Sequence, residues 1–372
     1  MEILGRREDG FHELDTVMVA IDWRDELKLR LQPTPGIELD VRWLPDRKTV
    51  ADQLAVPADD ALLDVPTDRS NLVYRALELV SEATGYRGGW QVELGKRIPS
   101  GAGMGGASSD AAATLRLAKS ALQRFDPTMT DSLTDEKMAS MAATLGSDVP
   151  FFLGKMSVHE SNTPDVPAPT PDPNSEPGTL ARALGRGEKL TFYDLPDPHR
   201  FVVIYPPTAL STAAVYSRAT VSDEPKSGLE TIKTFIRRSP IGGAEILYNA
   251  LAAPASGLSP HVNEALECLQ KSTTHYSTIQ YIAPRRQVAP NGECDGTNLY
   301  CQMTGSGSAC FAWLTPGFAS AESKSGSAAE VTGEADVVKS NELAAFVRES
   351  LAGGALVNVV ATCSAAPEIH IA

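Results

Sequence analysis

The sequence has 372 residues, of which 42% are hydrophobic and 22% charged, and its formal net charge is −14. This length accommodates two domains, and the composition is that of an ordinary globular protein. The acidic balance argues against nucleic acid as a partner. No apolar run approaches the roughly 20 residues that span a bilayer, and no basic, apolar signal segment opens the chain. We therefore expect a cytoplasmic protein that binds neither nucleic acid nor a membrane.

The cysteines and histidines predict no metal centre. The five cysteines are odd in number and form no Cys-x-x-Cys pair, and the six histidines are scattered. This usage favours reduced thiols over a disulfide framework or a zinc site.

The N-terminal part of the chain is predicted to be rich in β-structure. Apolar side chains alternate in residues 16–21, 27–31 and 37–41. Residues 71–83 then carry apolar side chains at helical spacing, and residues 90–94 alternate again. We expect a helix and a strand there, in that order.

A glycine-rich loop at residues 99–110, Pro-Ser-Gly-Ala-Gly-Met-Gly-Gly-Ala-Ser-Ser-Asp, leads directly into a helix predicted over residues 108–125. Glycines permit positive φ and the close approach of a ligand, and successive backbone N–H groups in such a loop can form a nest for an anion. The N-terminus of the following helix adds about half a positive elementary charge. The segment therefore predicts a binding site for a phosphate chain.

Two features of this loop leave alternatives open. Ser108 and Ser109 could cap the helix, or could hold a phosphate or Mg²⁺. The loop lacks the Gly-Lys-Ser/Thr of a Walker A motif, and its glycines are too dense for a dinucleotide fingerprint.

Asp148 follows a predicted helix over residues 134–145, whose first turn is acidic, and precedes an apolar segment that we expect to be a strand. Its carboxylate is a candidate base or orienting group for a substrate hydroxyl, although a turn aspartate is the alternative.

A second loop of small residues, 303–311, leads into a predicted strand over 310–314. It is either a tight turn or one wall of a phosphate site.

The C-terminal half mixes predicted elements with segments of low apolar content. Residues 161–178 hold six prolines and predict a disordered insertion. A strand is expected over residues 201–205, and helices over 243–251, 261–269 and, after a cap at Ser340, 341–351. Residues 285–296 and 320–334 are interpreted as surface insertions. Short alternating strands mixed with helices predict an α+β protein.

Four segments together resemble the GHMP kinases, in the family's order. They are residues 5–14 (Gly-Arg-Arg-Glu-Asp-Gly-Phe-His-Glu-Leu), Lys-Arg-Ile-Pro at 96–99 with the glycine loop, Gly-Ser-Asp-Val-Pro at 146–150, and Thr-Gly-Ser-Gly at 304–307. Asn-Leu-Val at 71–73 and Gly-Arg-Gly-Glu at 185–188 add weaker matches. The Asp-Gly-Phe-His part points to the branch that phosphorylates the 2-hydroxyl of 4-diphosphocytidyl-2-C-methyl-D-erythritol.

The resemblance, good over residues 3–155 and patchy afterwards, implies a two-domain α+β GHMP kinase fold. It implies a ribosomal protein S5 domain 2-like, ATP-binding domain over residues 1–195, with the insertion 161–178, and a ferredoxin-like domain over 196–372. The implied activity is γ-phosphoryl transfer from ATP, with Mg²⁺, in the non-mevalonate isoprenoid pathway. The partners would be the two small molecules, and the chain would be a monomer or a homodimer.

The resemblance also implies roles for individual residues. Asp148 would orient and deprotonate the acceptor hydroxyl, and His12 would hydrogen-bond the cytosine edge. Phe11, where the family usually has tyrosine, and Tyr216 would stack on the cytosine, at about 1–3 kcal/mol per stack; Thr212 would also contact the substrate. The implied nucleotide-binding residues are Asn71, Lys96, Pro99, Ser100, Gly101, Ala102, Gly103, Met104, Gly105, Gly106, Ala107, Ser108 and Ser109.

One departure from the family leaves alternatives. In the family, a Pro-Ala-Lys-Ile-Asn-Leu-type strand precedes the first segment, and its lysine pairs with the catalytic aspartate. This sequence begins at Met1, after that position, so we expect the natural chain to start upstream. Another GHMP kinase, for mevalonate, homoserine or a sugar, is the alternative enzyme, although His12 and the aromatic residues favour a cytidine-bearing acceptor. A non-catalytic nucleotide-binding relative is the alternative that the missing lysine favours.

Overall fold

The computed structural model describes residues 1–154, 178–195, 199–237, 247–280, 301–314, 331–351 and 353–362. Its strands are β1 (Glu2–Arg6), β2 (His12–Val19), β3 (Glu26–Gln32), β4 (Gly36–Trp43), β5 (Gly89–Lys96), β6 (Gly178–Gly185), β7 (Lys189–Leu195), β8 (Arg200–Tyr205), β9 (Cys301–Met303), β10 (Cys310–Leu314) and β11 (Leu356–Ala361). Its helices are α1 (Arg47–Leu54), α2 (Leu72–Thr84), α3 (Gly106–Phe125), α4 (Asp135–Leu145), α5 (Val149–Leu153), α6 (Thr212–Tyr216), α7 (Gly228–Arg237), α8 (Ala252–Ser256), α9 (Pro260–Gln280) and α10 (Val331–Ser350), with short 3-10 helices at Ala61–Leu63 and Pro127–Thr130.

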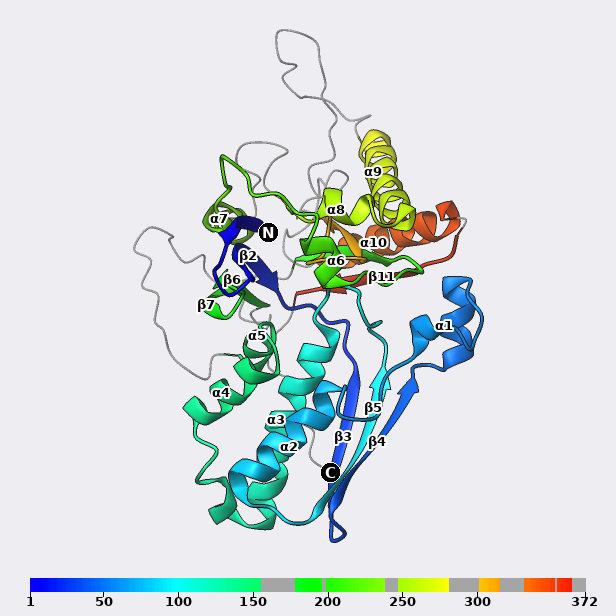
Figure 1. The fold of residues 1–372 in the computed structure, drawn as a ribbon. Coiled ribbons are helices and arrows are strands. Elements are labelled where there is room, and N and C mark those ends of the chain that lie inside the picture. The colour runs from blue at the N-terminus through cyan, green and yellow to red at the C-terminus, as the bar shows by residue number, and fades with distance from the viewer. Residues whose placement is uncertain are drawn as a thin grey trace.

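The strands form three sheets, with the orders β1-β2-β6-β7, β3-β5-β4 and β11-β8-β10-β9. Neighbouring strands in these sheets are antiparallel, apart from β4 and β5, which run parallel. The mixture of helices and mainly antiparallel strands confirms the predicted α+β class (Figure 1). The predicted domain boundary at residues 195/196 falls between β7 and β8, which belong to different sheets, and it stays a prediction.

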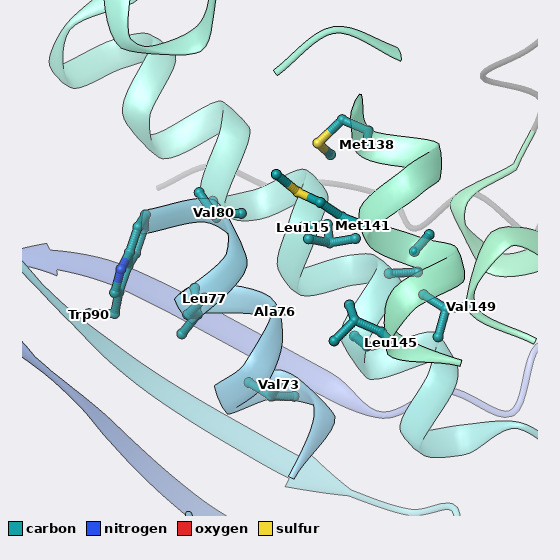
Figure 2. Close-up of a cluster of buried hydrophobic side chains, with 14 of the residues drawn as sticks. Val73, Ala76, Leu77, Val80, Trp90, Leu115, Met138, Met141, Leu145 and Val149 are labelled. Atoms are coloured by element: carbon teal, nitrogen blue, oxygen red, sulfur yellow. The ribbon is translucent and has the colours of Figure 1, made fainter. Parts of the chain in front are cut away.

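The first core lies between the β3-β5-β4 sheet and the helices α2, α3 and α4 (Figure 2). The apolar alternation predicted for β3 and β5 is confirmed, since Leu29 pairs with Val92 across the two strands. Val92 and, on α2, Leu77 are buried in this core, where Leu115 of α3 and Met141 of α4 meet them. This packing fixes α3, and therefore the glycine loop before it, against the sheet.

The second core surrounds β8, whose apolar side chains are buried on both faces of its sheet. Val202 and Ile204 pack on one face with residues of α8, α9 and α10. Phe201, Val203 and Tyr205 pack on the other face in a cluster that includes α1. A strand covered on both sides requires a continuous apolar sequence, which is why residues 201–205 were predictable.

Three local predictions are wrong. The apolar segment after Asp148 forms the helix α5 and not a strand, because Pro150 in the first helical turn needs no N–H partner. Residues 247–251 of the helix predicted over 243–251 are not helical, because the Asn249 carboxamide bonds the backbone of Leu251 and Met303 instead. Ser340 lies inside α10 and is not its N-cap, since this helix begins at Val331.

Several predicted segments lie outside the described residues, namely 161–177, 285–296 and 320–330, while 331–334, interpreted as part of a surface insertion, belong to α10. Among the described helices, none is long and apolar enough to cross a membrane.

Candidate active site

A cavity of about 2100 Å³ brings together the segments that the sequence singled out. Its walls include Phe11 and His12 from the start of the chain, Asp148 from the turn before α5, and Tyr216 from α6. The glycine loop and the loop around Gly305 form another part of the wall. Segments from Met1 to Phe311, up to 310 residues apart in the chain, therefore meet at one site.

The glycine loop has the backbone geometry that its sequence predicted. Gly101, Gly103 and Gly105 adopt φ values of 69°, 70° and 71°, in the left-handed region that favours glycine. Within the described contacts no side chain caps α3, and the Ser109 hydroxyl donates a hydrogen bond to the Gly106 carbonyl (2.8 Å). Ser108 and Ser109 therefore do not cap α3, which was the alternative role for these two serines. The loop residues that line the cavity are Gly101, Gly103, Met104, Gly105, Ser109 and Asp110.

The second small-residue loop packs directly on the first. The Thr304 hydroxyl donates to the Ala102 carbonyl (2.9 Å), and the backbone N–H groups of Ser308 and Ala309 donate to the carbonyls of Gly101 (3.2 Å) and Ala102 (3.1 Å). The Asn249 carboxamide supports this loop by donating to the carbonyls of Met303 and Gly305. The loop is thus one wall of the cavity.

Replacing Gly103 with alanine is expected to weaken both folding and ATP binding. A Cβ there would lie 2.5 Å from the Thr304 carbonyl oxygen and 2.8 Å from that of Gly307. Gly85 is the matched control, because it has the same φ of 70° but open space around its Cβ position. We expect urea unfolding to show that G103A costs about 1–3 kcal/mol more than G85A. Equal losses in the two variants would contradict the packing of the two loops.

The other predicted nucleotide-binding residues lie outside the lining of this cavity: Asn71, Lys96, Pro99, Ser100, Ala102, Gly106, Ala107 and Ser108. Asn71 is the N-cap of α2, where its carboxamide oxygen accepts from the Val73 N–H (2.9 Å) and its amide donates to the Pro66 carbonyl (2.7 Å). Its assignment to the nucleotide stays a prediction, since its side chain is used in this cap.

Lys96 is the centre of a buried charge cluster. Its side chain is 3% exposed, and its ammonium group bonds the carboxylates of Asp25 and, at 2.7 Å, Asp110. Asp25 in turn accepts from the backbone N–H groups of Arg97 and Ile98, the latter at 2.9 Å. Lys96 precedes the glycine loop and Asp110 is its last residue, so the cluster connects the two ends of the loop.

The protonation equilibria of this cluster reflect its burial. Burial alone would lower the pKa of Lys96, but the two carboxylates more than offset this effect and hold the pKa above its ordinary value. Burial raises the pKa of Asp110 to about 7, although the neighbouring Lys96 ammonium opposes this shift. Asp25 was not predicted as a site residue, because a lone aspartate before a strand carries no local signal of a partner 71 residues away.

Asp148 presents a carboxylate with few internal partners. It stands at the N-terminus of α5 but makes no capping bond, and the Ser147 hydroxyl donates to it at 3.1 Å. Burial raises the pKa of Asp148, and the bond from Ser147 opposes this shift. A Cβ on Gly187 would lie 3.8 Å from its Oδ1, so the turn between β6 and β7 packs beside it. A carboxylate in this setting can accept a proton from a hydroxyl group.

The aromatic residues gather at another part of the cavity wall. The rings of His12 and Tyr216 lie in contact, with centroids 5.1 Å apart and planes at 33°. Phe11 is 53% exposed, and the Thr212 hydroxyl lies 3.0 Å from that of Ser306. Burial and the nearby Arg6 guanidinium hold the pKa of His12 below its ordinary value. At neutral pH this ring is therefore uncharged and offers both a donor and an acceptor.

The described residues contain no group of three or more His, Cys, Asp or Glu side chains that could hold a metal ion. Among the described residues, the cysteines at positions 268, 301 and 310 form no disulfide, while those at 294 and 363 lie outside the described residues.

Comparisons with known proteins agree with this architecture. Residues 71–155 match the N-terminal domain of the GHMP kinases. The chain is 43% identical over its whole length to a 4-diphosphocytidyl-2-C-methyl-D-erythritol kinase of Rhodopirellula baltica, covering 94% of that protein. It is 31% identical over 85% of its length to the same kinase of Delftia acidovorans, covering 83% of it.

A solved structure extends the similarity to the fold. A crystal structure of 4-(cytidine 5'-diphospho)-2C-methyl-D-erythritol kinase superposes with a TM-score of 0.58 at 26% identity, over 96% of this chain and 94% of the other. This agreement confirms the two-domain α+β fold that the motifs implied. The chain therefore belongs to the 4-diphosphocytidyl-2-C-methyl-D-erythritol kinase family of the GHMP kinases.

Proposed function

We propose that this protein transfers the γ-phosphoryl group of ATP to the 2-hydroxyl of 4-diphosphocytidyl-2-C-methyl-D-erythritol. The observation that carries the proposal is that one cavity combines a glycine loop with positive φ at Gly101, Gly103 and Gly105, a carboxylate of raised pKa at Asp148, and aromatic residues beside a histidine of lowered pKa. The names of the relatives support the identity of the acceptor. We place this reaction in the non-mevalonate isoprenoid pathway.

In the proposed mechanism, the N–H groups of the glycine loop hold the triphosphate and orient the γ-phosphorus toward the acceptor. Asp148 accepts the proton of the acceptor 2-hydroxyl. The oxygen of that hydroxyl forms a bond to the γ-phosphorus, the bond between the γ-phosphorus and the β-phosphate oxygen breaks, and ADP leaves. Most of the rate enhancement in phosphoryl transfer comes from positioning and charge stabilisation. His12 and Tyr216, with Phe11, supply the positioning of the cytosine.

We include Mg²⁺ with the nucleotide, because a divalent ion neutralises the charge of the phosphates when it is bound. Ser109 and Asp148, which both line the cavity, are two oxygen-bearing residues that would suit such an ion. The Ser109 hydroxyl donates its proton to the Gly106 carbonyl, so its lone pairs face no internal donor among the described residues. We also propose that the protein is cytoplasmic and that it is a monomer or a homodimer.

A panel of acceptors tests the proposed function. With ATP, we expect kcat/KM for 4-diphosphocytidyl-2-C-methyl-D-erythritol to exceed that for mevalonate, homoserine or galactose by on the order of 10²-fold or more, since the cytosine adds about 1–3 kcal/mol per stack. Equal kcat/KM for acceptors without cytidine would identify another GHMP kinase. Binding of ATP without transfer to any acceptor would identify a non-catalytic relative.

A further inference from the structure

We propose that Arg116 is a positioning residue for the phosphoryl transfer, because it fixes the short helix α5, and with it Asp148, beside the glycine loop. This inference rests on the proposed function, since it takes Asp148 to be the proton acceptor. Arg116 belongs to α3, the helix that follows the glycine loop, and lies about two turns after Ser109. The helix that carries the end of the glycine loop therefore also carries the group that contacts α5.

The guanidinium of Arg116 contacts the C-terminal end of α5. Its Nη2 donates a hydrogen bond to the carbonyl of Leu153, the last residue of this helix. A Cβ on the next residue, Gly154, would lie 3.2 Å from the same nitrogen, so the guanidinium packs directly on the helix end. The last carbonyls of a helix have no partner within the helix, and the helix dipole favours a cation at this end. Arg116 therefore supplies from α3 a partner that α5 lacks.

The charge of Arg116 is partly buried and has no carboxylate partner in the part of the chain that the structure describes. Burial lowers the pKa of Arg116 from its ordinary value, and no neighbouring charge opposes this shift. The Nε atom is buried and makes no hydrogen bond among the described residues. A charged donor withdrawn from water is costly unless it is hydrogen-bonded. The Leu153 carbonyl is the acceptor that the structure shows, so the bond between α3 and α5 is strongly favoured.

Two aromatic side chains hold the rest of α5. The Phe152 ring lies against the glycine loop, since a Cβ on Gly105 would be 2.7 Å from its Cε2 atom. The Phe151 ring stacks on Phe192 of β7, with centroids 6.1 Å apart and planes at 10°. Together with Arg116, these contacts leave a helix of five residues little freedom to rotate or slide.

Asp148 depends on α5 for its position. Its carboxylate makes no capping bond, and the hydrogen bond that it accepts comes from Ser147, its own neighbour in the chain. This bond orients the side chain but does not fix it relative to the glycine loop. The helix α5 makes that connection, through Phe152 at Gly105 and through Arg116 on α3. A displacement of about 1 Å can cost on the order of 10²-fold in rate, so the contact of Arg116 with α5 should affect kcat.

Replacing Arg116 with methionine tests the inference, because methionine keeps an apolar stem and removes every donor of the side chain. We expect kcat for the proposed acceptor to fall about 10- to 100-fold, while KM for ATP and for the acceptor stays within about threefold of the wild type. R124M is the matched control, since Arg124 is exposed and lies on the same helix but outside the cavity. R116K should recover part of kcat, because lysine restores a cation without the planar fork.

A double-mutant cycle with D148N separates positioning from a general loss of structure. If Arg116 acts through Asp148, adding R116M to D148N should lower kcat by less than about twofold further. If the two losses multiply, Arg116 does not act through Asp148 and the inference is overturned. Amide hydrogen exchange gives a readout besides activity. The amides of Phe151 and Gly154 should exchange faster in R116M than in R124M, because α5 opens more easily without its contact to α3.

The other outcomes are also decisive. Equal kcat for R116M and R124M would show that α5 holds Asp148 without Arg116. A loss confined to KM for ATP would show that Arg116 supports the glycine loop and not Asp148. If the wild type transfers no phosphoryl group to the acceptor, the proposed function is wrong, and hydrogen exchange alone then decides whether Arg116 anchors α5.

Discussion

Replacing Asp148 with asparagine is expected to lower kcat by about 10²- to 10⁴-fold, the range of a lost general base. Asparagine has nearly the same shape but cannot accept a proton from the acceptor hydroxyl. The glycine loop is unchanged in this variant, so we expect KM for ATP to change much less than kcat. Steady-state kinetics with a coupled ADP assay measures both constants. Activity of D148N within tenfold of the wild type would remove Asp148 from its proposed role.

The pH dependence of kcat gives a second readout of the same residue. Only the ionised carboxylate can accept the proton, so kcat should fall as the pH decreases through the pKa of Asp148. Burial raises this pKa, and the fall should therefore begin at a higher pH than an exposed aspartate would give. The S147A variant is the matched control. It removes the hydrogen bond that favours the ionised form, and should move the acid limb to still higher pH with a smaller loss of kcat.

Replacing Lys96 with methionine is expected to reduce the free energy of unfolding by about 3–5 kcal/mol, the cost of removing one partner from a buried ion pair. The variant leaves the carboxylates of Asp25 and Asp110 buried at 3% and 7% side-chain exposure without their cation. Urea unfolding at neutral pH measures the loss. We also expect weaker ATP binding, because the two ends of the glycine loop lose the group that connects them.

Two further variants show whether the charge cluster is responsible. K48M removes an exposed lysine whose partner is Asp52, four residues along α1, and should leave the free energy of unfolding nearly unchanged. Adding D110N to K96M removes one of the two uncompensated carboxylates, so the double variant should be more stable than K96M. If K96M unfolds at the same urea concentration as K48M, the cluster does not stabilise the loop.

The sequence alone determined the features that depend on neighbouring residues. Apolar alternation in β3 and β5 and helical spacing in α2 and α3 follow from local periodicity, and the structure confirms them. The same holds for the glycine loop, where Gly101, Gly103 and Gly105 adopt the positive φ that glycine tolerates. The order of four motifs identified the family, because these short segments carry the chemistry of the site.

The tertiary structure decided what depends on residues far apart in the chain. Lys96 was predicted to border the nucleotide, but the approach of Asp25 and Asp110 makes it part of a buried cluster. Arg116 meets the Leu153 carbonyl, 37 residues away in the chain, only when α5 packs on α3. Local propensity does not encode such pairings, because they depend on how sheets and helices pack together. The long-range partners of a charged side chain therefore had to come from the fold.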